Sequence, residues 1–409
     1  METENRDLRS GRTVWEAQPL DAPKTARLTR DIRTDVLIVG AGTSGAFMAE
    51  TLTDAGFDVV VVDRRGPAEG ATTASTALIE YEIDTPLTEL RKQIGKDRAE
   101  RAWRRSYLAL SSLAARTRAL GIDCGAVRRD NLYLCGNVLD ANALEEESHA
   151  RRSIGIETAM LGRTDLKKTY GIARAAGLMA FDDLAADPRQ LAAGYLSVAI
   201  GRGARVYCPT TISDVRRSGR DVVAETAEGP RITSRHLVFC TGYELADHVP
   251  KKGHTIISTY AIATKPQRRN LWPGECFIWE ASDPYLYIRT TTDGGVICGG
   301  EDEEFENEEK RDALLARKTR TLERKLKKLL PDLDTAAAFA WAGSFGSTAT
   351  GLPSIGQIPR HAGRYAVLGF GGNGITYSRI GADIIRGELT GHPDPDRDLY
   401  AFSSARLMR

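Results

Sequence analysis

The chain has 409 residues, more than one ordinary hydrophobic core organises, so we expect two or more domains. Its charge is nearly balanced, with 56 basic and 55 acidic residues, and 42% of its residues are hydrophobic. This balance gives no electrostatic argument for nucleic-acid binding. No stretch is long and apolar enough to predict a membrane span, and the composition is that of an ordinary soluble enzyme.

The six cysteines form no C-x-x-C pair, and the six histidines do not stand at metal-ligand spacing from them. We therefore expect reduced thiols and no metal site. Residues 1–31 are polar throughout and contain no apolar run of the kind that a signal peptide needs. These features predict a cytoplasmic protein.

Residues 35–63, DVLIVGAGTSGAFMAETLTDAGFDVVVVD, carry G-x-G-x-x-G between a buried-type strand and a helix. Gly40 would allow the tight turn, Gly42 would let backbone amides approach a pyrophosphate, and Gly45 would let the helix lie close to the strand. The second strand ends at Asp63, where an acid would bond a ribose hydroxyl. Together these features predict a dinucleotide-binding unit.

This unit alone does not choose between NAD and FAD. Arg64 and Arg65 suit a 2′-phosphate and hence NADP, but they equally suit contacts to adenine and ribose, or a solvated strand end. The loop that follows is dense in small hydroxyl side chains, which either approach a ribityl chain and diphosphate or cap a helix start. These side chains are Thr72, Thr73, Ser75 and Thr76.

The middle of the chain predicts a charged helix with a solvated face over residues 88–120 and a helix that starts at Asp187-Pro188. An apolar strand then runs directly into Thr241 and Gly242. Three strand-like pieces precede it, at residues 204–207, 211–216 and 221–226. A β-meander that returns to a sheet in this way is typical of flavin-binding domains.

The stretch DPYLYIRTTTDGG alternates strictly, so it predicts a strand with Tyr285, Tyr287 and Arg289 on one face, followed by a hairpin turn. Two aromatic rings and a cation suit a cavity wall that holds a small amphiphile, but an edge strand with one wet face has the same pattern. Residues 301–333 predict an amphipathic surface helix whose acidic start is either solvated or attracts cationic substrates. Its inward side chains would be Leu315, Leu322, Leu326 and Leu329.

Residues 369–385, GFGGNGITYSRIGADII, form a second glycine-rich loop that opens a helix near Gly374. The strand YAVLGF delivers this loop, and Ile380, Ile384 and Ile385 would anchor the helix behind it. Two such loops, far apart in the sequence, favour one long cofactor held at both ends.

These segments, together with WAGSFGSTATGLPSIGQIP at residues 341–359, occur in the order seen in the D-amino-acid oxidase superfamily. The chain resembles this group over about residues 31–395, and within it most resembles the γ-glutamylputrescine oxidoreductase-like proteins, beside the glycine and sarcosine oxidases. The resemblance implies an α/β (α+β) fold with a Rossmann-like FAD-binding domain around a central parallel sheet, plus a substrate domain with a large antiparallel sheet. After an N-terminal extension (1–30), the FAD-binding domain would comprise residues 31–87, 187–250 and 343–400, and the substrate domain 88–186 and 251–342.

The resemblance also implies which residues hold FAD. Gly40, Gly42, Thr43, Ser44 and Gly45 would hold the diphosphate and Asp63 the ribose. Amides at the start of the last helix would stabilise negative charge on the reduced flavin. The remaining cofactor residues would be Arg64, Arg65 and Ile212 near adenine, Thr72, Thr73, Ala74, Ser75 and Thr76 along the ribityl chain and flavin, Thr241 and Gly242 over the nucleotide, and Gly372, Asn373, Gly374, Ile375 and Thr376 at the pyrimidine end.

One position departs from the amino-acid oxidases of this group. In glycine-oxidase-like sequences the arginine that grips the substrate carboxylate falls two positions after Trp-x-Gly, and here that position is Phe345. An amine whose oxidised carbon lies away from a carboxylate therefore fits better, unless Arg289 substitutes. Some relatives attach flavin through a Cys or His, but residues 341–376 contain no Cys and residues 64–80 no His, so we expect non-covalent FAD.

The implied reaction is hydride transfer from the carbon beside a neutral amine to flavin N5, which gives an imine that water hydrolyses. Oxygen or another acceptor would reoxidise the flavin. Tyr285, Tyr287 and Arg289 are the candidate substrate-cavity residues. Three alternatives stay open: an amino-acid oxidase or dehydrogenase that uses Arg289, a non-catalytic flavin-binding subunit of a larger dehydrogenase, and a plain NAD(P) dehydrogenase.

Overall fold

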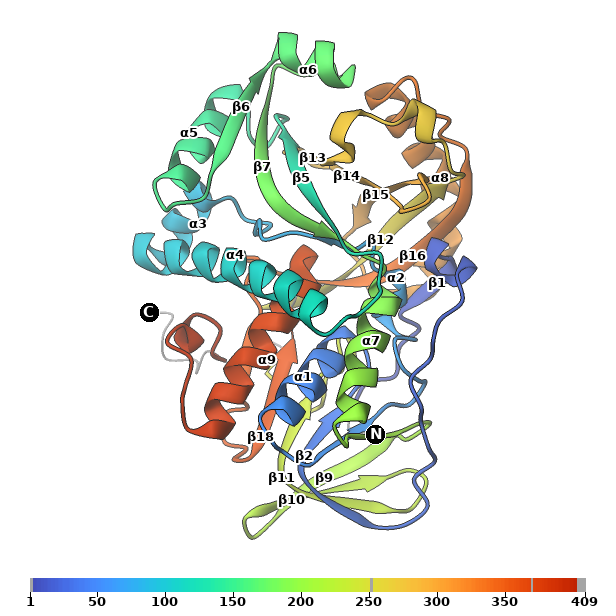
Figure 1. Cartoon of the computed structure of the whole chain (residues 1–409), viewed down its shortest axis with the longest axis vertical. Coiled ribbons are helices and arrows are strands. Elements are labelled where there is room, and N and C mark those ends of the chain that lie inside the picture. Colours follow the sequence, from blue (N-terminus) through green and yellow to red (C-terminus); the bar gives the residue numbers. More distant parts are fainter. Residues whose placement is uncertain (1–2, 251–252, 369–370, 403–409) are drawn as a thin grey trace.

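The computed structural model describes residues 3–250, 253–368 and 371–402. Within these ranges the chain forms two β-sheets, and helices pack against both of them (Figure 1). The lower sheet in Figure 1 is mostly parallel, and the upper one is almost entirely antiparallel. No helix in the described ranges is both long and apolar enough to cross a bilayer.

The parallel sheet begins with the predicted strand–helix–strand unit. Its strands run in the order β17, β18, β11, β2, β3 and β8, and the meander β9–β10 continues from β11. The strand bounds are β2 (Ile32–Val39), β3 (Val59–Val62), β8 (Arg205–Tyr207), β9 (Ile212–Ser218), β10 (Asp221–Thr226), β11 (Arg231–Phe239), β17 (Ser354–Gln357) and β18 (Arg364–Leu368). The predicted meander is thus present and returns to the sheet through β11.

The alternation of side chains along the buried strands explains why this sheet has a hydrophobic core on each of its two faces. Val36 and Ile38 of β2 belong to the core on the helical side, whereas Leu37 and Val39 belong to the core on the meander side. Successive side chains of a strand point to opposite faces, so an all-apolar strand is buried on both. The helical side is covered by α1 (Thr43–Asp54), α7 (Pro188–Gly201) and α9 (Gly374–Thr390).

Local signals decide where several helices begin and end. Asp187 caps α7, since its Oδ1 accepts from the amides of Arg189 at 2.8 Å and Gln190 at 3.1 Å, and Pro188 takes the first helical position. The helix predicted over residues 88–120 is in fact two helices, α3 (Leu87–Ile94) and α4 (Lys96–Ala119). Gly95 lies between them with a φ of +86°, which interrupts the helical hydrogen bonding.

Among the residues that the structure describes, the large sheet has ten strands, and its β13–β5 pair alone is parallel. Its order is β1, β16, β12, β15, β14, β13, β5, β7 and β4, with β6 added to β7. The bounds are β1 (Arg9–Arg12), β4 (Leu78–Ile79), β5 (Val127–Leu134), β6 (Thr158–Gly162), β7 (Ala176–Ala185), β12 (His254–Thr264), β13 (Phe277–Glu280), β14 (Leu286–Thr290), β15 (Val296–Glu303) and β16 (Ala337–Thr348). The predicted fold class is confirmed.

Helix α8 (Glu308–Leu329) covers one face of the large sheet with Leu322, Leu326 and Leu329 buried against it. The prediction that this helix starts at residue 301 is wrong. Residues 301–303 end strand β15, because the backbone pairing of β15 with β12 continues as far as Glu303, and Asn307 caps the helix. The start of the acidic run therefore belongs to the sheet.

Helices α5 (Ala141–Arg152) and α6 (Arg163–Tyr170) lie around β6 and β7. The single turn α2 (Ala71–Ala74) packs against α7 and β16, and α4 packs on α9. Strands β1 and β4 come from segments predicted for the extension and the FAD-binding domain, yet both pair within the large sheet. The domain boundaries given above stay a prediction.

Candidate cofactor and substrate site

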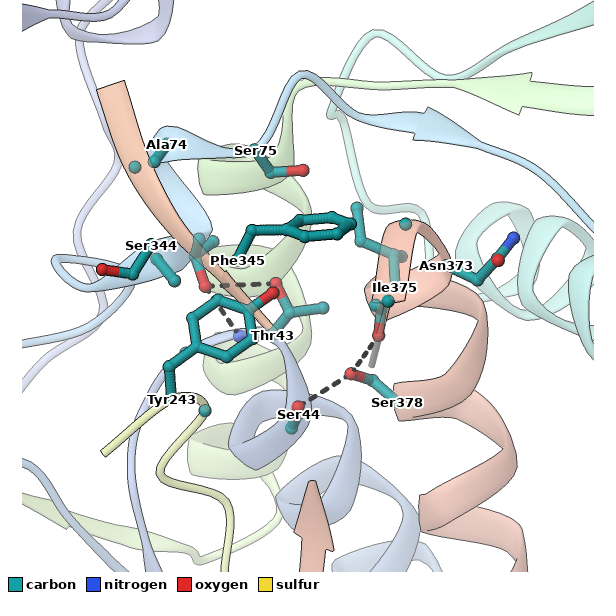
Figure 2. A pocket seen from close by; sticks show the side chains of 18 of the residues that line it. Thr43, Ser44, Ala74, Ser75, Tyr243, Ser344, Phe345, Asn373, Ile375 and Ser378 are labelled. Atoms are coloured by element: carbon teal, nitrogen blue, oxygen red, sulfur yellow. Dashed lines mark hydrogen bonds between the residues drawn. The ribbon is translucent and has the colours of Figure 1, made fainter. Parts of the chain in front are cut away.

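A cavity of about 520 Å³ lies between the two sheets, within the size range of ligand sites. The carboxyl ends of β2 and β3 and the first turns of α1 and α9 line one side, and β12, β14 and β15 line the other. Figure 2 shows Thr43 and Ser44 at the start of α1, Ser378 on α9, and the rings of Tyr243 and Phe345 that extend into the space between them.

The first glycine motif positions the backbone as predicted, with a different role for each glycine. Gly40 has a φ of +110°, and a Cβ there would lie 2.3 Å from the carbonyl oxygen of Cys240. Gly42 faces the cavity. Gly45 does not: its Cβ would lie 1.8 Å from the carbonyl oxygen of Gly40, so it serves the close packing of α1 on β2. The N-terminus of α1, with its partial positive charge, points at the cavity.

Hydroxyl groups connect three separate chain segments beside this helix start. The Thr43 amide donates to Thr72 Oγ1 at 3.1 Å, and Ser44 Oγ lies 2.7 Å from Ser378 Oγ (Figure 2). Thr72, Ala74, Ser75 and Thr76 line the cavity, whereas Thr73 is buried and donates to the Ala68 carbonyl at 2.6 Å. Thr73 is thus a structural residue and not a cavity residue.

Asp63, Arg64 and Arg65 all line the cavity, but their polar groups already have partners. Asp63 Oδ2 accepts from the Ala41 amide at 2.8 Å. Arg64 donates to the Glu4 carbonyl at 2.9 Å, and Arg65 holds both oxygens of Glu244 at 2.8 and 2.7 Å. The two arginines therefore hold the N-terminal segment and Glu244 beside this part of the cavity by hydrogen bonds. Their guanidinium groups are already engaged and do not offer a site for a 2′-phosphate.

Residues after the meander reach the same cavity. Phe239, the last residue of β11, is in register with Val39 of β2, which brings the following Thr241 and Gly242 beside the first glycine motif. Ile212, at the start of β9, also lines the cavity.

The C-terminal loop approaches the cavity through its backbone. The Thr376 hydroxyl donates to the Glu80 carbonyl at 2.7 Å, and the Asn373 amide group donates to the Glu82 carbonyl at 2.6 Å and points away from the centre of the cavity (Figure 2). The Gly372 amide donates to Asp84 Oδ2 at 2.8 Å. All five predicted residues of this loop line the cavity: Gly372, Asn373, Gly374, Ile375 and Thr376. Residues 369 and 370 of the predicted loop lie outside the described residues.

The predicted substrate wall is present only in part. Tyr285 and Tyr287 line the cavity, with ring centroids 5.9 Å apart. Arg289 does not line it: the side chain is 1% exposed, and its guanidinium is held by backbone carbonyls. An unpaired guanidinium away from water would be far less stable, so these acceptors fix its position. They are Thr76 at 3.3 Å, Ala186 at 3.0 Å, Thr290 at 3.0 Å, and Ala77.

Sequence reasoning missed a set of acidic and aromatic side chains that line the cavity. These are Glu80, Asp84, Tyr133, Tyr243, Trp279, Glu280 and Asp302. For Asp302 the sequence did contain a signal, because successive side chains of a strand point to opposite faces. Glu301 and Glu303 of β15 face Lys318 of α8, at 3.5 and 2.7 Å, so Asp302 faces the other way. There Asp302 Oδ2 accepts from the Tyr285 hydroxyl at 2.7 Å.

The pKa values of Glu80, Asp84 and Asp302 are raised because the surrounding protein keeps bulk water away. Desolvation raises the pKa of Asp84 to about 6, and the charge of Asp302 adds to the effect. Asp84 has exposed surface, but that surface faces the cavity. Desolvation also raises the pKa of Asp302, and that of Glu80 well above its usual range, with further repulsion from Glu82.

The residues of the cavity fit FAD. A helix N-terminus, small side chains and hydroxyls suit a diphosphate and ribityl chain, and the cavity continues from Ile212 at the meander to Tyr285 at the large sheet.

Residues 35–386 match the protein family described as FAD dependent oxidoreductase (DAO). The chain belongs to this family, and FAD is its cofactor.

Individual relatives are similar over nearly the full length. The gamma-glutamylputrescine oxidoreductase of Escherichia coli (strain K12) is 24% identical, with 93% of this chain and 91% of that protein covered. The crystal structure of glycine oxidase from Geobacillus kaustophilus superimposes with a TM-score of 0.74 at 22% identity, covering 92% of this chain and 100% of that one. Iminodiacetate oxidase from Chelativorans sp. BNC1 gives a TM-score of 0.70 at 21% identity, covering 90% and 98%. These solved structures share the fold.

Proposed function

We propose that this enzyme oxidises the C–N bond of a small amine that has no carboxylate on the reacting carbon, using non-covalently bound FAD. The observation that carries the proposal is the charge of the cavity wall. Among the described residues, the cations that line the cavity are Arg64 and Arg65, and Arg65 is paired with Glu244. Phe345 stands where related amino-acid oxidases place their carboxylate-binding arginine, and Arg289 is held by carbonyls outside the cavity.

The relatives support a nitrogen-bearing substrate. The Escherichia coli relative is named for a putrescine derivative, and the structural neighbours are named for glycine and iminodiacetate. The last two substrates are carboxylates, whereas the cavity wall of this chain is rich in carboxyl groups of its own. Like charges repel, so this wall favours an amine over an amino acid.

FAD, when bound, supplies the acceptor for the hydride that leaves the carbon beside the nitrogen. The chain's own residues would exclude water with Tyr285, Tyr287 and Phe345, and orient the amine so that its C–H bond faces the acceptor. The reacting nitrogen must be neutral to donate its lone pair, so an ammonium substrate first loses a proton, and Glu80 is a cavity-lining carboxyl that can take it. The imine product is then hydrolysed by water to a carbonyl compound and an amine.

An anaerobic substrate panel tests this proposal. The purified, FAD-loaded protein is mixed with simple amines, N-methyl amino acids and D-amino acids, and flavin absorbance is followed. Bleaching by amines, and much weaker bleaching by amino acids, is expected. Preferential bleaching by amino acids would contradict the proposal. Bleaching by none of the compounds would favour a flavin-binding subunit that acts only with a partner, and yellow colour bound to the denatured chain would contradict non-covalent attachment.

A further inference from the structure

The substrate end of the cavity has a wall of four carboxyl groups, Glu80, Asp84, Glu280 and Asp302, which we call the acidic wall. Glu280 is neutralised by an ion pair with Arg174. The other three are held by uncharged donors: Glu80 by Asn131 Nδ2 at 3.2 Å, Asp84 by the Gly372 amide at 2.8 Å, and Asp302 by the Tyr285 hydroxyl at 2.7 Å. Within the described ranges, none of these three forms an ion pair with a Lys, Arg or His side chain.

A second observation points to a missing hydrogen-bond donor at this wall. Oδ1 of Asp302 is shielded from solvent, and no described residue donates to it within hydrogen-bonding distance, although the Thr259 hydroxyl also interacts with this carboxyl group. A buried carboxylate oxygen without a partner is costly, and native structures rarely leave one unsatisfied. Lys318 does not supply the missing donor, because it is engaged by Glu301 and Glu303 on the other side of β15. A donor carried by a ligand would satisfy this oxygen.

Asp84 and Asp302 reach the cavity from different parts of the fold. Asp84 follows β4 and touches the C-terminal glycine loop, whereas Asp302 projects from β15 of the large sheet. Both groups line the same cavity, and the charge of Asp302 is among the causes that raise the pKa of Asp84. A cation between them would relieve this repulsion.

Aromatic rings complete the surroundings of this pair. Tyr133 and Trp279 stack with ring centroids 3.8 Å apart, and Tyr285 and Tyr287 stand beside Asp302. The negative faces of aromatic rings attract ammonium groups, and carboxylates with aromatic walls are a common way to bind them. Both the charge and the rings therefore select a cation.

We propose that Asp84 and Asp302 bind an ammonium group of the substrate that does not react, so that the substrate is a diamine-type cation with a second nitrogen remote from the oxidised carbon. The inference rests on the proposed amine oxidation. The reason for a second nitrogen is chemical: the reacting nitrogen must be neutral, and a nitrogen held between two carboxylates stays protonated. The ammonium group bound at this pair therefore positions the substrate without reacting, and Asp84 and Asp302 are specificity-determining residues.

The test separates binding from turnover. The probe is butyltrimethylammonium, a quaternary cation without a lone pair, whose affinity for the FAD-loaded protein is measured by isothermal titration calorimetry. Asp84→Asn and Asp302→Asn keep the shape of each side chain and remove one charge. We expect each to weaken binding about tenfold or more, because the variant loses the Coulombic attraction between one carboxylate and the cation. Asp214→Asn, on the exposed face of β9, is the matched control with the same charge change and should leave the affinity unchanged.

A second arm compares 1,4-diaminobutane with n-butylamine in anaerobic flavin bleaching. We expect the diamine to bleach wild-type flavin at concentrations at least tenfold lower, and Asp302→Asn to remove most of this advantage. FAD content and far-UV circular dichroism check that each variant is folded, and Asp302→Asn carries the test if Asp84→Asn loses FAD. Equal potency of the two amines, or unchanged probe affinity in a folded Asp302→Asn variant, would contradict the binding of a second ammonium group at Asp84 and Asp302. Neither result would contradict amine oxidation itself. Bleaching by amino acids alone would instead overturn the proposed function.

Discussion

Ser44 Oγ on α1 lies 2.7 Å from Ser378 Oγ on α9, although 334 residues separate them in the chain. Each serine stands in the first turns of a helix that a glycine-rich loop opens, and both line the cavity. The contact brings the two helix N-termini to one site, so that both direct partial positive charge at it. One long, negatively charged cofactor that reaches both helix N-termini explains this convergence.

Gly374→Val should impair FAD retention. Gly374 begins α9 and lines the cavity, so a branched side chain there would occupy cofactor space. The measurement is the ratio of flavin to protein absorbance after purification. Gly201→Val is the matched control, because Gly201 ends α7 with nothing within 4 Å of its Cβ position. Full flavin content and unchanged turnover in Gly374→Val would refute this placement of the loop.

Arg289→Met should lower stability without changing the choice between amines and amino acids. The guanidinium of Arg289 donates to the carbonyls of Ala186 and Thr290, and its removal leaves buried acceptors unpaired. We expect a loss of about 2–4 kcal/mol in the free energy of unfolding, from one or two such acceptors. Urea denaturation measures this loss. If the variant keeps its stability and selectively loses amino-acid oxidation, Arg289 is a carboxylate-binding residue after all.

Phe345→Arg should shift specificity toward amino acids. The variant places a guanidinium at the cavity position where glycine-oxidase-like sequences have their carboxylate-binding arginine. We expect the ratio of kcat/KM for D-alanine to that for n-butylamine to rise about tenfold or more, the effect of one charge-assisted contact. Phe345→Leu controls for the loss of the ring and should not raise this ratio. A ratio that stays the same in both variants would show that Phe345 does not face the substrate.

Binding of the quaternary probe should strengthen as pH rises from 5 to 7. The pKa of Asp84 is raised to about 6, so the group is largely protonated and neutral below that pH and becomes a carboxylate above it. The cationic probe binds the carboxylate form, so its affinity should rise as Asp84 loses its proton. In Asp84→Asn this rise in affinity between pH 5 and 7 should be smaller. The ionisable groups that interact electrostatically with Asp84 are Asp302, Glu80, Tyr133, Tyr243, Tyr285 and Tyr377.

The tyrosines among these groups do not titrate in this range, because desolvation raises their pKa values further above neutrality. The profile therefore reports on carboxyl groups. Calorimetric titrations at several pH values provide the measurement. Affinity that is constant, or that falls, between pH 5 and 7 in the wild-type protein would contradict the assignment of Asp84 as an ammonium ligand.

Features that depend on neighbours in the sequence were predictable. The turn at Gly40 needs a positive φ, β3 and the second half of β2 are apolar runs, and Asp187-Pro188 starts a helix, so each element carries its own local signal. The same holds for α9, whose Ile380, Ile384 and Ile385 are buried at helical spacing. The family match confirmed FAD, which the two glycine loops predicted together.

Features that depend on distant parts of the chain were not predictable from local patterns. Alternation placed Tyr285, Tyr287 and Arg289 on one face, but it could not show that carbonyls of Ala77 and Ala186 would capture the guanidinium of Arg289 outside the cavity. The acidic run at residues 301–303 has the charge of a solvated helix start. It continues strand β15, in which Glu303 pairs with Ser258 of β12, and such a partner exists only once the sheet has formed.

The sequence by itself thus predicted the cofactor class and the two glycine-rich loops that line the cavity, because the glycine positions impose backbone geometry over a few residues. Only the tertiary structure decided the substrate end. There Asp84, from the loop after β4, and Asp302, from β15, line the same cavity, while the cation of Arg289 lies elsewhere. The physical reason is that backbone conformation is a local property, whereas the charge of a cavity is the sum over side chains that the fold brings together.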